Sequence, residues 1–472
     1  MDEGINSYYE NRYMKENYKN HNFIDLPKVI LNESKQGSLL ENAYLVLARE
    51  HQDTPPDTHS NEFSQLAYGL QVYMKTAICM HWLEQSVRTE VFDAAMQEYY
   101  RRWQFRHPYP EDLRAILEEK NLDVAWFFDA MQTRKQVDFK LKKIVLKPLN
   151  FEPGSSAIPT PGWLLEIENK GELFAPFSVT ALKNGNPLKT KWFPAGVGQS
   201  TQIVDFSIPD TVIYPDAFEI DWPRKTLDLN RKDNFRRTSG LFPGMRPLEY
   251  RSLAIFQNAR RNTIAAIPWL GWNNYDKMML GLLVYNPPLP SRKFQYYLLP
   301  GYSTGSKKMV GLADLRYKFF PGGWFPKVTV GVAAKSFDFD YNVADDYYSR
   351  FYRIAPQIRA ELSSGSMSFS HAVNFRTLII GREAALRSIE GQYLGKTWKK
   401  NTIYELRYEG EEHRLPNPYS FQIALETQGY RDALDQPAHY LRGTAMWRQK
   451  FFYRDKKKIM MRLFAGYFIQ ST

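Results

Sequence analysis

Cysteine is nearly absent from this sequence, since Cys79 is the only one among its 472 residues. A single thiol forms no disulfide within the chain and offers only one ligand to a metal. The sequence therefore excludes a disulfide-stapled fold and a cysteine-rich zinc site.

Long apolar runs are absent as well. No stretch reaches the roughly 18 to 20 uninterrupted apolar residues that a transmembrane helix needs, and the first residues do not resemble a secretion signal. The charge is only mildly one-sided, because 62 Lys and Arg against 51 Asp and Glu leave a formal charge of +11. That excess suits anionic lipid or solubility as well as nucleic acid, so charge alone identifies no partner.

Aromatic residues, in contrast, are abundant. Tyr and Phe occur 30 times each and Trp 11 times, which is 15% of the chain, and they are concentrated in its second half. A chain of this length is too long for one ordinary core, so we expect on the order of two to four domains.

The first region, residues 1–138, has the apolar spacing of helices. An apolar residue recurs every four positions and predicts a stripe along one long helix: Val87, Val91, Ala95, Tyr99 and Trp103. The segment "RHPYPED" then interrupts the pattern, because its two prolines cannot continue a helix but can begin the next one.

In the second region, residues 139–234, the apolar period changes to two. In "WLLEIENKG", Trp163, Leu165 and Ile167 share one face, and Asn184-Gly185 predicts a hairpin turn. These features predict a small β-sandwich. Because "NRKDNFRRTSG" at its end is polar and basic, we expect a solvated linker at residues 235–250.

The third region, residues 251–472, predicts longer and more aromatic strands. "MVGLADLRYKF" alternates apolar and charged residues, and so do "TIYELRYE", "FQIALETQ" and "IMMRLFAGYFIQ". On the order of ten such segments form the weak sequence pattern of an outer-membrane β-barrel. A soluble sandwich gives the same alternation, but aromatic residues near the strand ends favour the barrel, because such residues suit the two membrane interfaces.

The barrel interpretation assigns the two faces of these strands. The residues expected to meet lipid are Leu315, Tyr404, Leu406, Ile423 and Leu463. Those expected to face a polar interior are Arg316, Glu405, Arg407, Glu426 and Arg462.

Three segments of the first region, in this order, resemble one family: "MDEGINSYYENRY", "VYMKTAICMHWLEQSVRTEVFDAAMQEYYRRWQFRHPYPEDL" and "LDVAWFFDAM". They are similar to the later half of the catalytic domain of the aminopeptidase N family (peptidase family M one), whose members are gluzincin zinc metallopeptidases. The second region, as far as "TLDLNRKDN", resembles the β-domain that follows in Bacteroidetes-type members, and some of these end in an outer-membrane-like barrel. The resemblance implies a multidomain α + β fold: the helical part of a gluzincin catalytic domain, a β-sandwich and an antiparallel barrel-like region.

The resemblance also implies roles for particular residues. Glu3 matches the family's glutamate ligand to Zn²⁺, which acts with the two histidines of a His-Glu-x-x-His helix and leaves one metal position for the attacking water. Tyr73 in "VYMK" matches the tyrosine whose phenol stabilises the oxyanion, although Thr76 stands where the family usually has glycine. Glu10, seven residues after Glu3, either orients the site or is a surface acid.

The histidines do not complete a zinc site. None of the eight is paired with another at the i, i+4 spacing of a His-Glu-x-x-His helix. We expect His81 and His107 to pack or cap rather than to bind metal, since neither has a partner at ligand spacing.

The family's Gly-x-Met-Glu-Asn segment, which binds the substrate's amine, is missing too. We therefore expect Met1 to be an internal methionine, with the zinc-binding helix encoded on the order of twenty residues before Glu3, and the final "AGYFIQST" to stop within a strand. The chain alone is predicted to be inactive.

These observations predict a fragment of a Zn²⁺-dependent aminopeptidase that acts on peptides at the cell envelope, in contact with the outer-membrane lipid of a Gram-negative bacterium. The alternative is a membrane β-barrel protein that carries a non-catalytic peptide-binding remnant. Nucleic-acid binding is disfavoured, because "NRKDNFRR" and "NARRN" are short and adjoin no recognition helix.

Overall fold

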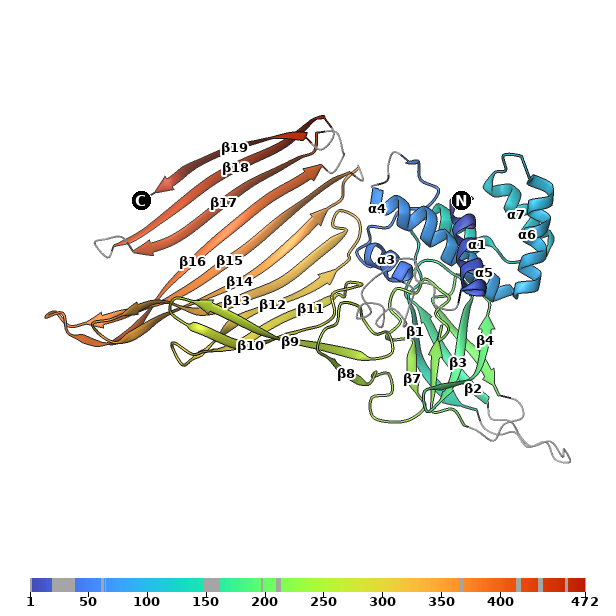
Figure 1. Cartoon of the computed structure of the whole chain (residues 1–472), viewed down its shortest axis with the longest axis horizontal. Coiled ribbons are helices and arrows are strands. Elements are labelled where there is room, and N and C mark those ends of the chain that lie inside the picture. Colours follow the sequence, from blue (N-terminus) through green and yellow to red (C-terminus); the bar gives the residue numbers. More distant parts are fainter. Residues whose placement is uncertain are drawn as a thin grey trace. The chain divides into compact units, whose positions relative to one another are not determined.

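The computed structural model describes residues 2–18, 39–60, 63, 65–147, 162–196, 198–208, 214–365, 368–412, 417–431, 436–454 and 457–471. Strands make up 52% of the residues that the structure describes and helices 19%, so the fold is mostly β. The chain divides into two compact units, residues 1–249 with 258–262 and residues 250–257 with 263–472 (Figure 1). In the part that the structure describes, no helix is both long and apolar enough to cross a membrane.

Short helices form the first part of unit 1. They are α1 (Asp2–Asn17), α3 (Leu39–Ala48), α4 (Gln65–Tyr68), the π-helix η2 (Gly69–Lys75), α5 (Thr76–Val87), α6 (Thr89–Trp103), α7 (Pro110–Glu119) and α8 (Ala125–Gln132). Their core is aromatic: Trp82 of α5 and Trp126 of α8 are buried with ring centroids 4.6 Å apart.

The single long helix predicted through Trp103 is wrong at Arg88. This residue has φ 82°, which ends α5 at Val87 and lets α6 begin at Thr89. The prolines act as expected, because α7 begins at Pro110 and the Asp112 carboxylate accepts the N–H of Tyr109 at 2.7 Å.

Two sheets form the second part of unit 1. One contains β1 (Phe139–Leu146), β2 (Gly162–Asn169) and β5 (Thr201–Ser207), and the other β4 (Asn186–Phe193), β3 (Phe177–Lys183), β6 (Ala217–Ile220) and β7 (Phe235–Arg237). Buried rings of the two sheets meet: Trp163 lies 5.6 Å from Phe218, and Phe139 lies 5.1 Å from Phe177. The sheets therefore share one core, as the predicted sandwich requires. The hairpin turn between β3 and β4 is confirmed, since Asn184 and Gly185 have φ 51° and 78°.

Residues 235–250 agree only in part with the predicted solvated linker, since residues 237–242 are exposed but Arg246 is buried. They include β7 and the first residues of β8 (Leu248–Arg251). Arg246 is only 3% exposed and donates to both oxygens of the Glu219 carboxylate, at 2.9 and 3.0 Å. Arg246 is thus held inside unit 1 by an acidic partner, whereas Arg237 is exposed and donates to the Phe242 carbonyl at 3.0 Å.

A sheet of twelve strands, from β8 to β19, dominates the second half of the chain. Its further strands are β9 (Asn262–Asn273), β10 (Lys277–Tyr285), β11 (Phe294–Ser303), β12 (Met309–Phe319), β13 (Lys327–Asn342), β14 (Tyr347–Leu362), β15 (Phe369–Arg387), β16 (Tyr393–Glu412), β17 (Tyr419–Arg431), β18 (Pro437–Arg454) and β19 (Lys457–Ser471). Each strand pairs with the next along the chain. Among the described strands, β8 and β19 are the two edges of the sheet and do not pair with each other. The sheet is therefore open, whereas a closed barrel would need these two edges to pair.

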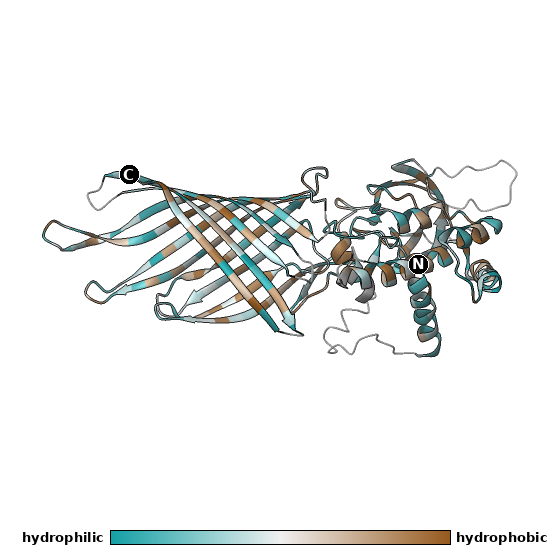
Figure 2. Cartoon of the chain, turned by 90° about the horizontal axis from the view of Figure 1, so that it is seen from above, coloured by the Kyte–Doolittle hydropathy of each residue, from teal (hydrophilic) through white to brown (hydrophobic). Residues whose placement is uncertain are grey.

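The predicted alternation along these strands is confirmed (Figure 2). Leu406 pairs with Phe375 on one side and Leu425 on the other, whereas Glu405 pairs with Arg376 and Glu426. Leu315, Tyr404, Leu406, Ile423 and Leu463 lie on one face, and Arg316, Glu405, Arg407, Glu426 and Arg462 lie on the other. We call these the apolar face and the polar face.

Candidate functional site

The candidate site begins where α1 crosses η2 and α5 at very short range. A Cβ on Gly4 would come within 2.2 Å of the Thr76 Cβ and 2.8 Å of the Val72 carbonyl oxygen. Only glycine fits such a crossing without displacing the neighbouring helix. Gly4 is therefore the structural reason that Glu3, the residue before it, lies beside η2.

Glu3 and Tyr73 are brought together by this crossing. Both side chains are half-buried. The pKa of the Tyr73 phenol is raised above its ordinary value, first by burial and then by the negative charge of Glu3. Tyr73 thus stays protonated at neutral pH and keeps the O–H that an oxyanion donor needs.

Tyr73 also lies in a wide helical turn that the sequence did not indicate. The π-helix η2 runs from Gly69 to Lys75, between α4 and α5. Turns of this kind are rare in proteins, but those that do occur often lie at functional sites. They change the direction of a side chain without ending the helix. The Tyr68 ring packs edge-on against Tyr73, with the centroids 5.8 Å apart.

Buried polar groups lie next to Tyr73 in the chain. Gln71 is fully buried, and neither its amide nitrogen nor its amide oxygen has a hydrogen-bond partner. Lys75 is 1% exposed, and its Nζ has no hydrogen-bond partner. Burial lowers the pKa of Lys75, although the negative charge of the nearby Asp53 acts in the opposite direction. Unsatisfied buried groups cost stability, which indicates that this turn is not shaped by packing alone.

Glu10, the other predicted candidate on α1, has different surroundings from Glu3 and Tyr73. Its side chain is exposed. Among the described residues no hydrogen bond or ion pair connects it to Glu3 or Tyr73, so the structure places Glu10 at the surface of α1.

His81 packs as predicted, and both of its ring nitrogens are engaged. Nδ1 lies 2.7 Å from an oxygen of Glu84, and Nε2 lies 2.6 Å from the Lys225 ammonium. Burial and the charge of Lys225 lower the pKa of His81 to about 4, so the neutral ring donates from Nδ1 and accepts at Nε2. No lone pair is left for a metal. His107 is exposed.

The described residues do not by themselves form a zinc centre. Within the described ranges no three His, Cys, Asp or Glu side chains are grouped so that they could hold a metal ion. Glu3 is a single carboxylate, and a zinc site needs at least three protein ligands. His21 and His413 lie outside the described residues.

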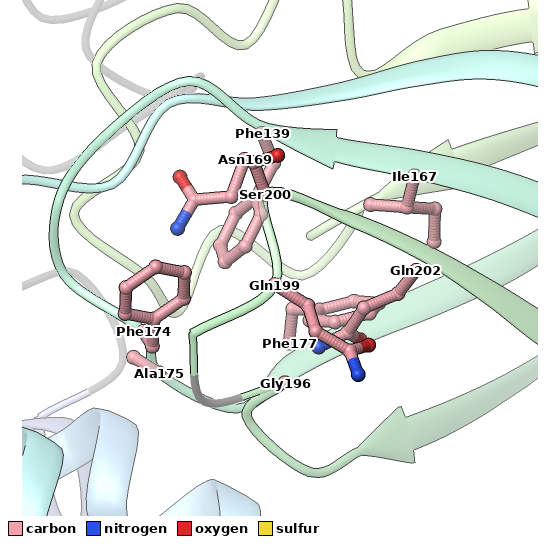
Figure 3. Close-up of a pocket in the computed structure, with 10 residues that line it drawn as sticks. All are labelled: Phe139, Ile167, Asn169, Phe174, Ala175, Phe177, Gly196, Gln199, Ser200 and Gln202. Atoms are coloured by element: carbon pink, nitrogen blue, oxygen red, sulfur yellow. The ribbon is translucent and has the colours of Figure 1, made fainter.

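A small pocket in the β-sandwich is a weaker candidate (Figure 3). Phe139, Ile167, Phe177 and Asn169 line it, and it has room for about one water molecule. The Asn169 amide is already used, since its oxygen accepts from the Gly171 N–H at 3.0 Å and its nitrogen donates to the Leu173 carbonyl at 2.8 Å. This pocket is part of the fold and offers nothing to a peptide.

The Glu3–Tyr73 pair is therefore the site that geometry and sequence resemblance both single out. It joins residues of α1 and η2 that lie seventy positions apart in the chain. No protein-family model matches this sequence, and no curated protein is detectably similar to it.

Proposed function

We propose that this chain contributes two residues to a zinc-dependent metallopeptidase of aminopeptidase type, and that its twelve-stranded sheet anchors the enzyme in the outer membrane. The observation that carries the peptidase half is the close approach of the Glu3 carboxylate to the Tyr73 phenol across the Gly4 crossing. A carboxylate ligand and a phenolic donor for the oxyanion are the two groups that the family resemblance assigns to these positions.

The test begins with the DNA upstream of the codon for Met1. An in-frame His-Glu-x-x-His sequence there supports the peptidase. A ribosome-binding site placed for initiation at Met1 contradicts it.

Site variants in the product of the complete reading frame then separate the two roles. Glu3→Ala should remove most bound zinc and activity. Tyr73→Phe should keep zinc and lower kcat by about two to three orders of magnitude, the usual loss for one oxyanion donor. Equal loss of zinc in both variants would make Tyr73 a structural residue.

The membrane half of the proposal rests on an inverted distribution of polarity. On β16, Leu406 of the apolar face is 46% exposed, whereas Glu405 of the polar face is 6% exposed. On β17, Leu425 is 43% exposed and its neighbour Ala424 only 5%. The more accessible side of the sheet is thus the apolar one, and this is the opposite of what water selects.

Four adjacent cross-strand rows of the apolar face contain no charged residue, and we call them the apolar band. The rows are Leu298, Ala313, Ala334, Ile354, Ile379, Thr402 and Gly429; Tyr296, Leu315, Val332, Pro356, Thr377, Tyr404 and Thr427; Phe294, Tyr317, Val330, Ile358, Phe375, Leu406 and Leu425; and Phe319, Val328, Ala360, Val373, Tyr408 and Ile423. Such a surface suits hydrocarbon and not water.

Aromatic clusters bound the apolar band on both sides. At one end Tyr419 stacks on Trp447 at 4.7 Å, and Phe421, which lies beyond the last row, meets Tyr408 of that row at 5.3 Å. At the other end Trp398 packs on Tyr352 at 5.0 Å. Trp398 and Tyr408 are ten residues apart on β16, about 33 Å along a strand, or about 25 Å of membrane depth at a tilt near 40°.

Flotation with liposomes of phosphatidylethanolamine and phosphatidylglycerol tests the anchor. The folded chain should float with the vesicles and stay with them in high salt, because lipid contact is apolar and is not screened. A chain that salt removes, or one that is monodisperse in water without detergent, would refute the anchor.

A second function is favoured by one observation, the lack of a three-ligand metal group among the described residues. In that case the chain is a membrane protein whose helical part binds peptides without cleaving them. Peptide affinity that does not change when Zn²⁺ is removed, in a chain whose reading frame starts at Met1, would favour this second function.

A further inference from the structure

The polar face of the large sheet contains two zones that differ in how their cations are compensated. In the first zone, the cations have acidic partners: Arg376 donates to Glu405 at 2.9 Å, and Arg407 donates to the other oxygen of Glu405 at 2.7 Å. Further along the same face Arg442 donates to Glu426 at 2.8 Å. This zone is a network of paired charges.

In the second zone every charged side chain is a cation. We call this zone the cationic patch, and its residues are Lys335, Arg353, Arg382 and Lys399. Lys335 of β13 lies directly opposite Arg353 of β14 in the register, and Arg382 of β15 lies directly opposite Lys399 of β16. Arg353 pairs with Ile380, two residues before Arg382, so the two cation pairs are diagonal neighbours on one face. Four adjacent strands thus present four positive charges together.

These four side chains have no acidic partner among the residues that the structure describes. Arg353 is half-buried, and its Nε is buried without a hydrogen-bond partner. Lys335 lies over the Phe351 ring at 5.4 Å, a contact that does not neutralise its charge. The nearest acid along the register, Asp314, is already held by Arg316 through two hydrogen bonds of 2.7 Å.

Like charges directly opposite each other weaken a sheet. Elsewhere on the same face, arginines are paired with carboxylates: Arg376 with Glu405 and Arg442 with Glu426. Arginine forks bind phosphate oxygens through two parallel hydrogen bonds, and lysine adds a point charge. The patch therefore has the composition of a receptor for an anion with several charged oxygens.

We propose that the cationic patch binds a multivalent oxyanion of the phosphate class on the polar face of the sheet. The anion would lie between the two cation pairs and accept hydrogen bonds from Arg353 and Arg382, while Lys335 and Lys399 add charge. This inference does not rest on the peptidase or on the lipid contact, because it uses only residues of the polar face.

Titration calorimetry with inorganic pyrophosphate tests the patch, using the full chain folded in detergent micelles at low salt. Pyrophosphate should bind at one site, and Arg382→Gln should weaken its affinity about tenfold or more. The matched control is Arg442→Gln, which removes the same charge from the same face but from the paired zone, and it should leave the affinity within about twofold of the wild type.

A second readout guards against a folding defect in the variant. Pyrophosphate should raise the Tm of the wild type and of Arg442→Gln but not that of Arg382→Gln. The proposal is overturned if Arg442→Gln lowers the affinity as much as Arg382→Gln does, since binding would then follow net charge alone. It is overturned as well if pyrophosphate gives neither binding heat nor a Tm shift with the wild type.

Discussion

Gly4 of α1 lies against Thr76 of α5 so closely that a Cβ at position 4 would be 2.2 Å from the Thr76 Cβ. This contact sets the position of Glu3 relative to Tyr73. A glycine that neighbours a candidate ligand therefore has a purely steric role in the site.

Gly4→Ala should push α1 away from η2 and α5. The overpacking should lower the free energy of unfolding by about 1 to 3 kcal/mol. As Glu3 moves off, the pKa of Tyr73 should fall toward its ordinary value, because part of its rise comes from the charge of Glu3. Urea unfolding measures the first effect, and tyrosinate absorbance against a Tyr73→Phe reference measures the second.

Gly69→Ala is the matched control. Gly69 begins η2, and nothing lies within 4 Å of a Cβ built on it. Alanine there should be neutral or stabilising by up to about 1 kcal/mol. Equal effects of the two substitutions would show that the α1 crossing is not tight.

The stability of unit 1 should depend on pH through the titration of His81. Its folded-state pKa of about 4 lies below the ordinary value of 6.5, so between these pH values the unfolded chain binds more protons. Stability should therefore fall as the pH drops from about 6.5 to 4, by on the order of 2 kcal/mol for this group. Glu84 and Lys225 contact the ring directly, and Lys15 adds a repulsive charge.

Urea midpoints at pH 7 and pH 5 for the wild type and His81→Gln measure this contribution. The variant should lose less stability than the wild type over this interval, because glutamine does not titrate. An identical loss in both proteins would assign the acid sensitivity to other groups.

The buried pair Arg246–Glu219 should matter far more than a surface pair of the same kind. Arg246→Met would leave the Glu219 carboxylate, 5% exposed, without its ion-pair partner, at a cost of about 3 to 5 kcal/mol. The control is Arg102→Met, which breaks the surface pairs with Glu98 and Glu119 and should cost far less, because water screens both. Chemical denaturation of both variants gives the comparison, and similar losses would mean that the Arg246 pair is open to water.

These cases show which features a single sequence reveals. The Asn184-Gly185 turn, the helix start at Pro110 and the alternation of Glu405 with Leu406 depend on near neighbours in the chain, and each could be predicted. The burial of Arg246 could not, because its partner Glu219 lies 27 residues away. The engagement of His81 by Lys225, 144 residues away, has no local signal either.

The break at Arg88 was missed for another reason. A positive φ is uncommon at a residue other than glycine, and an arginine side chain does not indicate one. The close approach of Glu3 and Tyr73 was suggested by family resemblance, but its cause, the Gly4 crossing, is visible only in three dimensions.

The surroundings of the apolar band can be tested with one charge. Leu406 is 46% exposed, so Leu406→Arg should change stability by less than about 0.5 kcal/mol if water covers this face. In a membrane the same charge would lie in hydrocarbon and should cost about 2 to 4 kcal/mol near the midplane. Urea unfolding of the chain folded in phospholipid vesicles, followed by tryptophan fluorescence, distinguishes the two.

The control must add the same charge to the polar face without breaking an ion pair. Glu405 is unsuitable because it accepts from both Arg376 and Arg407. Gln428 lies on the polar face of β17, two residues from Glu426, and its partner across β16 is Ile403. Gln428→Arg should therefore stay within about 1 kcal/mol of the wild type in vesicles. If both variants lose the same stability there, depth in a bilayer plays no part, and the apolar band must be covered by protein instead of lipid.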